Sequence, residues 1–306
     1  MERKVMKQGP STLVVSLPSN WVKKYGVKKG STVYLQEKGT EITIAKRPQQ
    51  EQKKITLNLS NTLPMTHRIS GALYKTGFDE ITLEYKNSDE ARAILESVNV
   101  FQGHEIIKHE NNTISIKRIA QPDATSFDTL YRKCFHIVED MANDTTDALQ
   151  KNNKERMNQV VLKDDLMAVF VNYTIRMIVL GYKDKHSAKY YHIVVQLEKI
   201  ADRFKYLCRW YAESQHNPSI SMITLTKDLK IYLHMLHDLF YNFSLEKVTI
   251  FGKERRALQR KAELTLQKID KKEVPPFVDA VSIISMIFDL NGPIMEINCS
   301  ENIGVE

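Results

Sequence analysis

Four carboxylates occur as two pairs whose spacing suits oxygen coordination of a metal ion. Glu198 and Asp202 are four residues apart, and so are Asp140 and Asp144. Residues four apart lie on one side of an α-helix, about one turn from each other. Divalent or iron-type ions such as Mg²⁺, Mn²⁺ and iron favour oxygen-rich sites. If the two helices belong to one bundle, the four carboxylates could converge on its carboxylate face and bind such ions there.

The alternative is a solvated acidic face without a metal. Lys205 follows Asp202 by three residues and could pair with it, a contact worth about 0.2–0.5 kcal/mol on a helix surface. Both interpretations place the carboxylates away from the centre of the apolar stripe of their helix. The spacing alone leaves both open.

The residues that must position Glu198 and Asp202 form a long amphipathic helix over 186–213. This segment contains no Pro or Gly. Its apolar residues recur at i, i+3, i+4 and i+7, which predicts one packing face and one carboxylate face. The apolar positions are Ile193, Leu197, Ile200, Ala201, Phe204, Leu207, Cys208 and Tyr211.

Five further segments have helical patterns. They lie at 127–149, 154–180, 222–250, 254–269 and 277–297. With the helix at 186–213 they make two consecutive sets of three. Residues 123–306 are therefore expected to form an all-α region of two three-helix bundles, over 123–215 and 219–306.

The run LEKIAD at residues 197–202 resembles the LERIxD signature of the PhoU family, regulators of phosphate uptake built from two three-helix bundles. The resemblance covers the helical half, roughly residues 123–306. In that family Glu/Asp-x-x-x-Asp pairs bind metal ions. The resemblance therefore implies a metal site at Glu198 and Asp202, and extends to Asp140 and Asp144.

The second set of helices has weaker signals for a metal site. Asp289 has the position of the Asp in the family pattern, but Ser285 stands where the first carboxylate should be. His234 and His237, with Asp238, could form a ligand cluster by chance. The chain contains no phosphate-binding P-loop, nucleophile-elbow or zinc-protease motif, so no enzyme activity is expected.

All the excess positive charge lies in the first 47 residues. These carry ten Lys and Arg side chains against three Glu, a net charge of +7, which equals that of the whole 306-residue chain. A compact basic segment favours a polyanionic partner. We expect Arg3, Lys4 and Lys7 to contact DNA phosphates, joined by the hydroxyls of Ser11 and Thr12 in the following turn. The alternative is a solvated surface on a module that only dimerises.

Residues 1–47 are expected to fold as strand-strand-helix-strand-strand, with strands at 3–7, 12–17, 32–37 and 41–45 and a helix at 19–25. So short a unit cannot bury enough apolar surface alone, and dimerisation would solve this. The segment is similar to the AbrB/MazE/SpoVT swapped-hairpin family. The matching features are Leu-Pro before the helix, Gly-Val-x-x-Gly after it and the Val-x-Leu strand. The resemblance implies an interleaved homodimer that binds DNA.

A separate α+β module is expected over residues 53–120, after a polar linker at 48–52. Strands at 55–59, 80–85, 104–108 and 113–119 and helices at 64–75 and 89–98 give the order β-α-β-α-β-β, with the helices on one sheet face. Ser88 is expected to cap the second helix. No motif indicates what this module does.

The expected fold class is thus multidomain α+β, and the expected function is regulation of phosphate uptake. The protein would be a cytoplasmic, DNA-binding homodimer whose bundles act, as the PhoU resemblance implies, on a phosphate ABC transporter ATPase or a sensor kinase. The alternative is a dimeric adaptor that does not bind DNA and negatively regulates such a transporter or its signalling partner. No apolar run approaches the roughly 18 residues of a transmembrane segment. Three widely spaced cysteines favour a reducing compartment.

Overall fold

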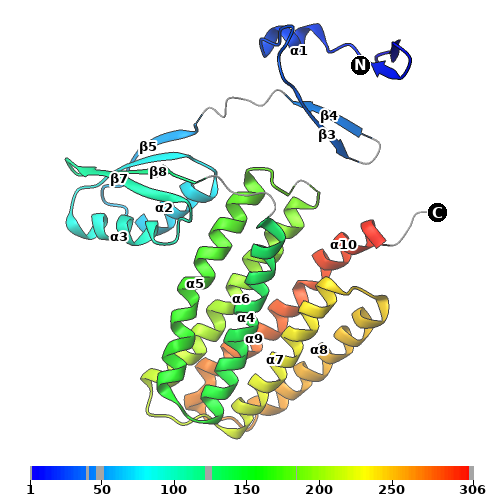
Figure 1. Ribbon diagram of the computed structural model, residues 1–306. Coiled ribbons are helices and arrows are strands. Elements are labelled where there is room, and N and C mark those ends of the chain that lie inside the picture. The colour runs from blue at the N-terminus through cyan, green and yellow to red at the C-terminus, as the bar shows by residue number, and fades with distance from the viewer. Residues whose placement is uncertain (1, 39–40, 46–51, 121–125, 184, 303–306) are drawn as a thin grey trace. The chain divides into compact units, whose positions relative to one another are not determined.

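The computed structural model describes residues 2–38, 41–45, 52–120, 126–183 and 185–302. The chain divides into two compact units, Met1–Lys53 and Lys54–Glu306. The first holds a small β module, and the second holds a mixed sheet followed by a helical region (Figure 1). The expected multidomain α+β class is confirmed. The expected turn at 39–40, most of the linker at 48–52 and the start of the helical region at 123–125 lie outside the described residues.

The first unit contains two antiparallel hairpins and a short helix. β1 (Met6–Gln8) pairs with β2 (Thr12–Val14), and β3 (Tyr34–Lys38) pairs with β4 (Glu41–Ala45). Between them lies α1 (Ser19–Lys24), after which Gly26 has a φ of +57°, a left-handed conformation that favours Gly. The order of elements is the expected one. The first strand, however, begins three residues later than expected.

None of the described side chains of the first unit is buried. Val5, Leu13, Leu35 and Ile42 are between 63% and 69% exposed, and the two hairpins form separate sheets. Exposed apolar side chains on both hairpins mean that one copy of this unit does not build a hydrophobic core from its described residues. A unit of this size needs a further source of burial to be stable.

The second unit begins with a four-stranded sheet in the order β5-β6-β8-β7. β5 (Lys54–Asn58) and β6 (Glu80–Glu84) are parallel, and α2 (Thr66–Lys75) makes the crossover that such a pair requires. β8 (Thr113–Arg118) pairs antiparallel with β6 and with β7 (His104–Glu110). α3 (Ser88–Val98) packs beside α2 on the same sheet face (Figure 1). The expected element order is confirmed.

The cap of α3 differs from the prediction. Asn87, not Ser88, is the N-cap: its side-chain oxygen accepts hydrogen bonds from the backbone N–H groups of Asp89 at 3.1 Å and Glu90 at 3.0 Å. Asn and Ser are about equally good caps. Local sequence therefore did not distinguish the two neighbouring positions.

Two sets of three helices follow. α4 (Phe127–Gln150), α5 (Lys154–Val179) and α6 (Ser187–Glu213) pack against one another. α7 (Ile220–Tyr241), α8 (Leu245–Leu266) and α9 (Val274–Asp289) form the second set, followed by α10 (Asn291–Asn302). Because α6 packs on α9 and α4 on α7, one continuous apolar core crosses both sets. All eight apolar positions predicted for the packing face of α6 are buried in it.

Helix boundaries in the second set differ from those expected. The helix expected at 222–250 is interrupted after Tyr241, and α8 begins at Leu245 with Ser244 as its N-cap. Gly252, which lies between the expected helices at 222–250 and 254–269, is inside α8. A single Gly inside a helix costs only about 1 kcal/mol relative to Ala, so packing along the rest of α8 outweighs it. The helix expected at 277–297 breaks at Leu290.

The stretch Lys271–Cys299 is long and apolar enough, by length and composition, to cross a membrane. It is interrupted at Leu290, and α9 buries Phe277, Ile283 and Ile287 in the core shared by both helix sets. Helices that pack inside a protein core pass the same test. Packing therefore accounts for part of the apolar composition of this stretch.

A buried charge network joins the sheet module to α5. Arg176 is 1% exposed and lies 3.2 Å from the carboxylate of Asp79, which immediately precedes β6. It also donates to the backbone carbonyl oxygen of Tyr74 in α2. Arg118, at the end of β8, lies 3.2 Å from the same Asp79 oxygen. One carboxylate is thus shared by two guanidinium groups that come from different parts of the unit.

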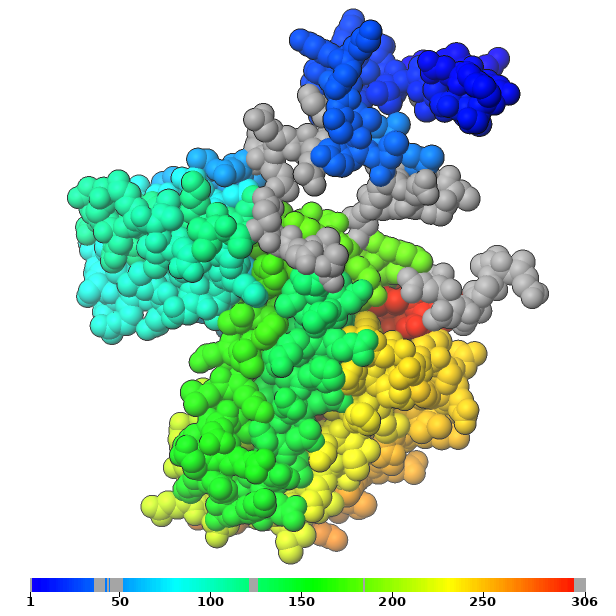
Figure 2. Space-filling view, viewed as in Figure 1, coloured from blue at the N-terminus to red at the C-terminus, as the bar shows by residue number. Residues whose placement is uncertain are grey.

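Close backbone packing accompanies this network. A Cβ atom at Gly77 would lie 3.0 Å from a methyl group of Leu180, and Gly77 has a φ of +93°. Only Gly satisfies both conditions without a shift. Figure 2 shows the module lying against the side of α5.

We expect Arg176→Met to lower the free energy of unfolding by about 3–5 kcal/mol, because it leaves Asp79 buried with less compensation. Equilibrium denaturation in urea measures this loss. As a matched control, Lys108→Met removes a cation from the exposed pair of Lys108 and Glu110 and should cost less than about 1 kcal/mol. Equal losses in the two variants would show that the buried network does not stabilise the unit.

Candidate functional site

The five residues expected to contact DNA lie at one end of the first unit. Lys7 is on β1, Thr12 opens β2, and Ser11 lies in the turn between them. Arg3 and Lys4 precede β1 rather than lying on it, because the strand begins at Met6. All five side chains are exposed. Lys7, Ser11 and Thr12 therefore lie on the hairpin, whereas Arg3 and Lys4 lie just before it in the chain.

Other lysines of the first unit have a local explanation. Lys23 and Lys24 occupy the last turn of α1. Cations are favourable at a helix C-terminus because they compensate the helix dipole. These lysines can therefore be compared with Arg3, Lys4 and Lys7, which carry the same charge in the same unit but are expected to contact DNA.

A second candidate site lies in the helical unit, where a cleft of about 990 Å³ separates the sheet module from α5 and α6. Glu198 and Asp202 of α6 line it, together with Asp164 of α5 and Lys75 of α2. We call this the carboxylate cleft. Asp164 was not among the residues singled out from the sequence, because nothing in its spacing relates it to a helix that follows it by more than twenty residues.

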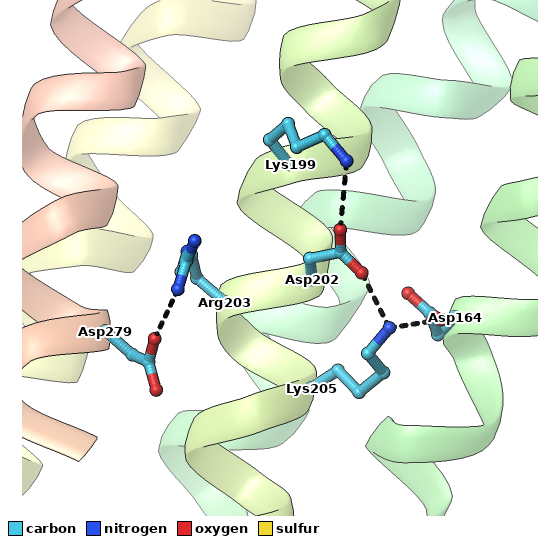
Figure 3. A network of polar contacts seen from close by, with 6 residues as sticks. All are labelled: Asp164, Lys199, Asp202, Arg203, Lys205 and Asp279. Atoms are coloured by element: carbon cyan, nitrogen blue, oxygen red, sulfur yellow. Dashed lines mark hydrogen bonds and ion pairs between the residues drawn. The ribbon is translucent and has the colours of Figure 1, made fainter. Parts of the chain in front are cut away.

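Within the carboxylate cleft, Lys205 bridges two acids. Its Nζ lies 2.6 Å from the carboxylate of Asp202 and 2.6 Å from that of Asp164, as Figure 3 shows. Lys199 lies farther from Asp202, at 3.4 Å. Burial alone would lower the pKa of Lys205, but its bonds to the two acids outweigh this and raise the pKa. The ammonium group therefore stays charged between the two carboxylates.

The surroundings of Glu198 differ from those of Asp202. Its carboxylate forms no hydrogen bond or ion pair with the described residues, and burial raises its pKa, with Lys199 and Lys75 acting against that shift. Asp202 and Asp164 add to the rise through repulsion. A half-buried carboxylate that faces a cleft and has no direct counterion is available to a cation or a hydrogen-bond donor from solution.

The second carboxylate pair lies elsewhere. Asp144 is held by Arg156 at 3.0 Å and Lys163 at 2.6 Å, and Asp140 is exposed on the surface of α4. Neither residue lines the carboxylate cleft. The structure therefore brings Glu198 and Asp202 together but does not gather all four carboxylates into one cluster.

His234 and His237 do not combine with Asp238. Asp238 pairs with Lys247 at 2.6 Å, whereas both imidazole rings face Glu139 of α4. Glu139 was not among the residues predicted from the sequence. Its three-residue spacing from His136 was the available signal.

Replacement of Glu198 by Gln should stabilise the protein at pH 7. The pKa of Glu198 is higher in the folded than in the unfolded state, so ionisation opposes folding above the usual Glu pKa near 4.3. The gain should shrink as the pH falls below that value, because both states are then protonated. Thermal unfolding from pH 4 to 8 measures it. As a control, Asp140→Asn at an exposed site should change stability by less than about 0.5 kcal/mol. A loss of stability in Glu198→Gln at pH 7 would contradict the assignment of Glu198 as uncompensated.

Two comparisons find similar proteins, one for a large part of the chain and one for its first unit. A solved structure, the phosphate transport system regulatory protein PhoU from Streptococcus pneumoniae, aligns with 60% of this chain and 98% of its own, with 11% identity and a TM-score of 0.48. A comparison with curated proteins finds no match. Residues 6–52 match the family described as antidote-toxin recognition MazE, bacterial antitoxin. The N-terminal segment therefore carries a domain of the MazE/AbrB type, as its sequence indicated.

Proposed function

We propose that the protein is a non-enzymatic, DNA-binding regulator of phosphate transport. One observation carries the proposal. A basic β module of the MazE/AbrB type is joined, in one chain, to two sets of three helices that present the LEKIAD carboxylates in an open cleft. The first part supplies an anion-binding surface, and the second supplies a place where a signal can bind.

DNA binding is proposed for the first unit of a homodimer. Apolar side chains on both hairpins are exposed, and interleaving with a second copy would bury them. Dimerisation would also double the set formed by Arg3, Lys4 and Lys7 and match the two-fold symmetry of a DNA site. Phosphate contacts would position the dimer, with the hydroxyls of Ser11 and Thr12 adding hydrogen bonds.

Signal input is proposed at the carboxylate cleft. Glu198 and Asp202, with Asp164, offer oxygen ligands to a divalent or iron-type ion. Asp140 and Asp144 would form a second, weaker site, because Arg156 and Lys163 already neutralise Asp144. Binding of an ion, a transporter ATPase or a sensor kinase to the helices would change dimer geometry and so DNA affinity. Such a regulator would act in the cytoplasm.

Replacement of Arg3, Lys4 and Lys7 by Ala should weaken DNA binding and flatten its salt dependence. Each lost phosphate contact removes about 0.9 from the slope of log affinity against log salt concentration. A mobility-shift series with promoter DNA of phosphate-transport genes, at several salt concentrations, measures both quantities.

The matched control for this test is a variant with Lys23, Lys24 and Lys28 replaced by Ala. It removes the same charge from the same unit, but from the end of α1 and the turn after it. The proposal requires a larger loss in the first variant. Equal losses would indicate only a general effect of net charge.

Mn²⁺ should bind at the carboxylate cleft, and Lys205→Met should bind it at least about tenfold more tightly. A unit charge about 4 Å from a cation costs roughly 4 kcal/mol near a protein surface, and tenfold corresponds to about 1.4 kcal/mol. Calorimetric titration of Mn²⁺ measures this change. Lys189→Met is the control, because Lys189 lies near the start of α6, does not line the cleft and pairs with Glu296 of α10. If Asp202→Asn binds Mn²⁺ as wild type does, the metal part of the proposal is wrong.

The second candidate function is a dimeric adaptor that does not bind DNA. It is favoured by the cleft itself, which lies in the helical unit and needs no DNA to receive a partner. In this case the first unit only dimerises, and the helices dock on a phosphate ABC transporter. Regulation of phosphate uptake that survives the Arg3, Lys4 and Lys7 replacement would favour the adaptor.

A further inference from the structure

A cluster of histidines surrounds one glutamate where α4 packs against α7. Glu139 lies at its centre, with its side chain 17% exposed. Its Oε2 atom lies 2.8 Å from Nδ1 of His237 and 3.6 Å from Nδ1 of His136, and its Oε1 atom lies 3.0 Å from Nδ1 of His234. At least one imidazole nitrogen atom therefore lies close to each of the two carboxylate oxygens.

Packing fixes the central imidazole. The ring of His237 stacks on the fully buried ring of Phe135, with centroids 5.0 Å apart and planes at 13°. The edge-on rings of His136 and Tyr241 lie 5.1 Å from it on other sides. A ligand side chain whose orientation is already set by its neighbours loses little conformational freedom when it binds an ion.

The separations suit a metal ion of the first transition series. One ligand atom each from His136, Glu139 and His237 lies within 4.8 Å of the others. Four ligands at about 2.0–2.1 Å from a tetrahedral ion lie roughly 3.4 Å from one another. The ligand atoms therefore need to move by less than about an ångström to surround an ion.

We propose that His136, Glu139 and His237 form a binding site for a divalent transition-metal ion, with zinc as the ion that fits best. Two imidazoles and one carboxylate are a ligand set that zinc accepts, with a fourth position left for water. His234 holds the other oxygen of Glu139 and positions the carboxylate, as hydrogen-bond partners of ligating carboxylates do. His136 is half exposed and His234 mostly exposed, so an ion can enter from solvent.

The ligand chemistry separates this site from the carboxylate cleft. Imidazole suits zinc, copper, nickel and iron, whereas Mg²⁺ is bound through oxygen. The Glu139 carboxylate accepts hydrogen bonds from Nδ1 of His234 at 3.0 Å and from Nδ1 of His237 at 2.8 Å. The site therefore offers one negative charge and two neutral nitrogens to a divalent ion.

The position of the site gives it a structural consequence. Glu139 and His136 belong to α4, in the first set of helices, and His237 belongs to α7, in the second. An ion bound there would connect the two sets, which also meet through apolar packing and through polar contacts such as the ion pair of Arg203 and Asp279 at 3.0 Å. Zinc should therefore raise the unfolding temperature of the protein, since it binds only the folded arrangement.

Calorimetric titration of Zn²⁺ into untagged, chelator-treated full-length protein tests the proposal. We expect one equivalent of Zn²⁺ to bind in a form that excess Mg²⁺ does not displace. Glu139→Gln and His237→Ala should each weaken binding by more than about tenfold, since even the loss of a residue behind the ligands costs 10–100-fold in known sites. Co²⁺ in place of Zn²⁺ should give the visible absorption of a four-coordinate ion.

His192→Ala is the matched control, because His192 is an exposed histidine of α6 outside the cluster. It should bind Zn²⁺ as wild type does. Circular dichroism establishes that each variant is folded, and His136→Gln, at a half-exposed position, replaces His237→Ala if the latter unfolds. The absence of Zn²⁺ binding by wild type, or wild-type affinity in Glu139→Gln, would overturn the proposal. The proposal does not depend on DNA binding or on phosphate regulation.

Discussion

A buried carboxylate joins the sheet module of the second unit to α5. Asp79 lies between Arg176 of α5 and Arg118 of β8, and all three side chains are at most 9% exposed. Two guanidinium groups and one carboxylate are stable in a buried position only when the hydrogen bonds of all three groups are satisfied. This requirement fixes α2 and the start of β6 against α5. Because α2 also supplies one wall of the carboxylate cleft, the shape of the cleft follows from the same contact.

The acidic cleft is largely neutralised by the protein itself. Lys205 occupies the space between Asp202 and Asp164, where a bound ion would otherwise reduce their repulsion. Glu198, one turn earlier on α6, has no such partner and keeps a raised pKa. The unsatisfied charge of the site is thus concentrated on one residue. A ligand that compensates the charge of Glu198 therefore gains more binding free energy than a ligand that must first displace Lys205 from Asp202 and Asp164.

Charge and apolar burial are separated along the chain. The first 47 residues carry the whole net charge of +7, and the described side chains of the first unit include no buried one. The second unit holds two apolar cores, one under the mixed sheet and one shared by both sets of helices. Like charges crowded on a small unit oppose compaction. A second copy would bury the exposed apolar side chains, and DNA would supply negative charge that reduces the repulsion. Dimerisation and DNA binding are proposed together for this reason.

The sequence determined what depends on local periodicity. Eight of the nine buried positions of α6, the β-α-β-α-β-β order and the strand–helix order of the first unit follow from spacing and turn residues that lie within a few positions of one another. Helix ends in the second set were less predictable, because Gly252 and the break after Tyr241 depend on the packing available to α8 rather than on local propensity. The tertiary structure alone decided which charges meet. It placed Asp164 with Asp202, Arg176 with Asp79, and Glu139 with three imidazoles, since such pairs join helices and strands whose separation in the chain carries no information about their distance in space.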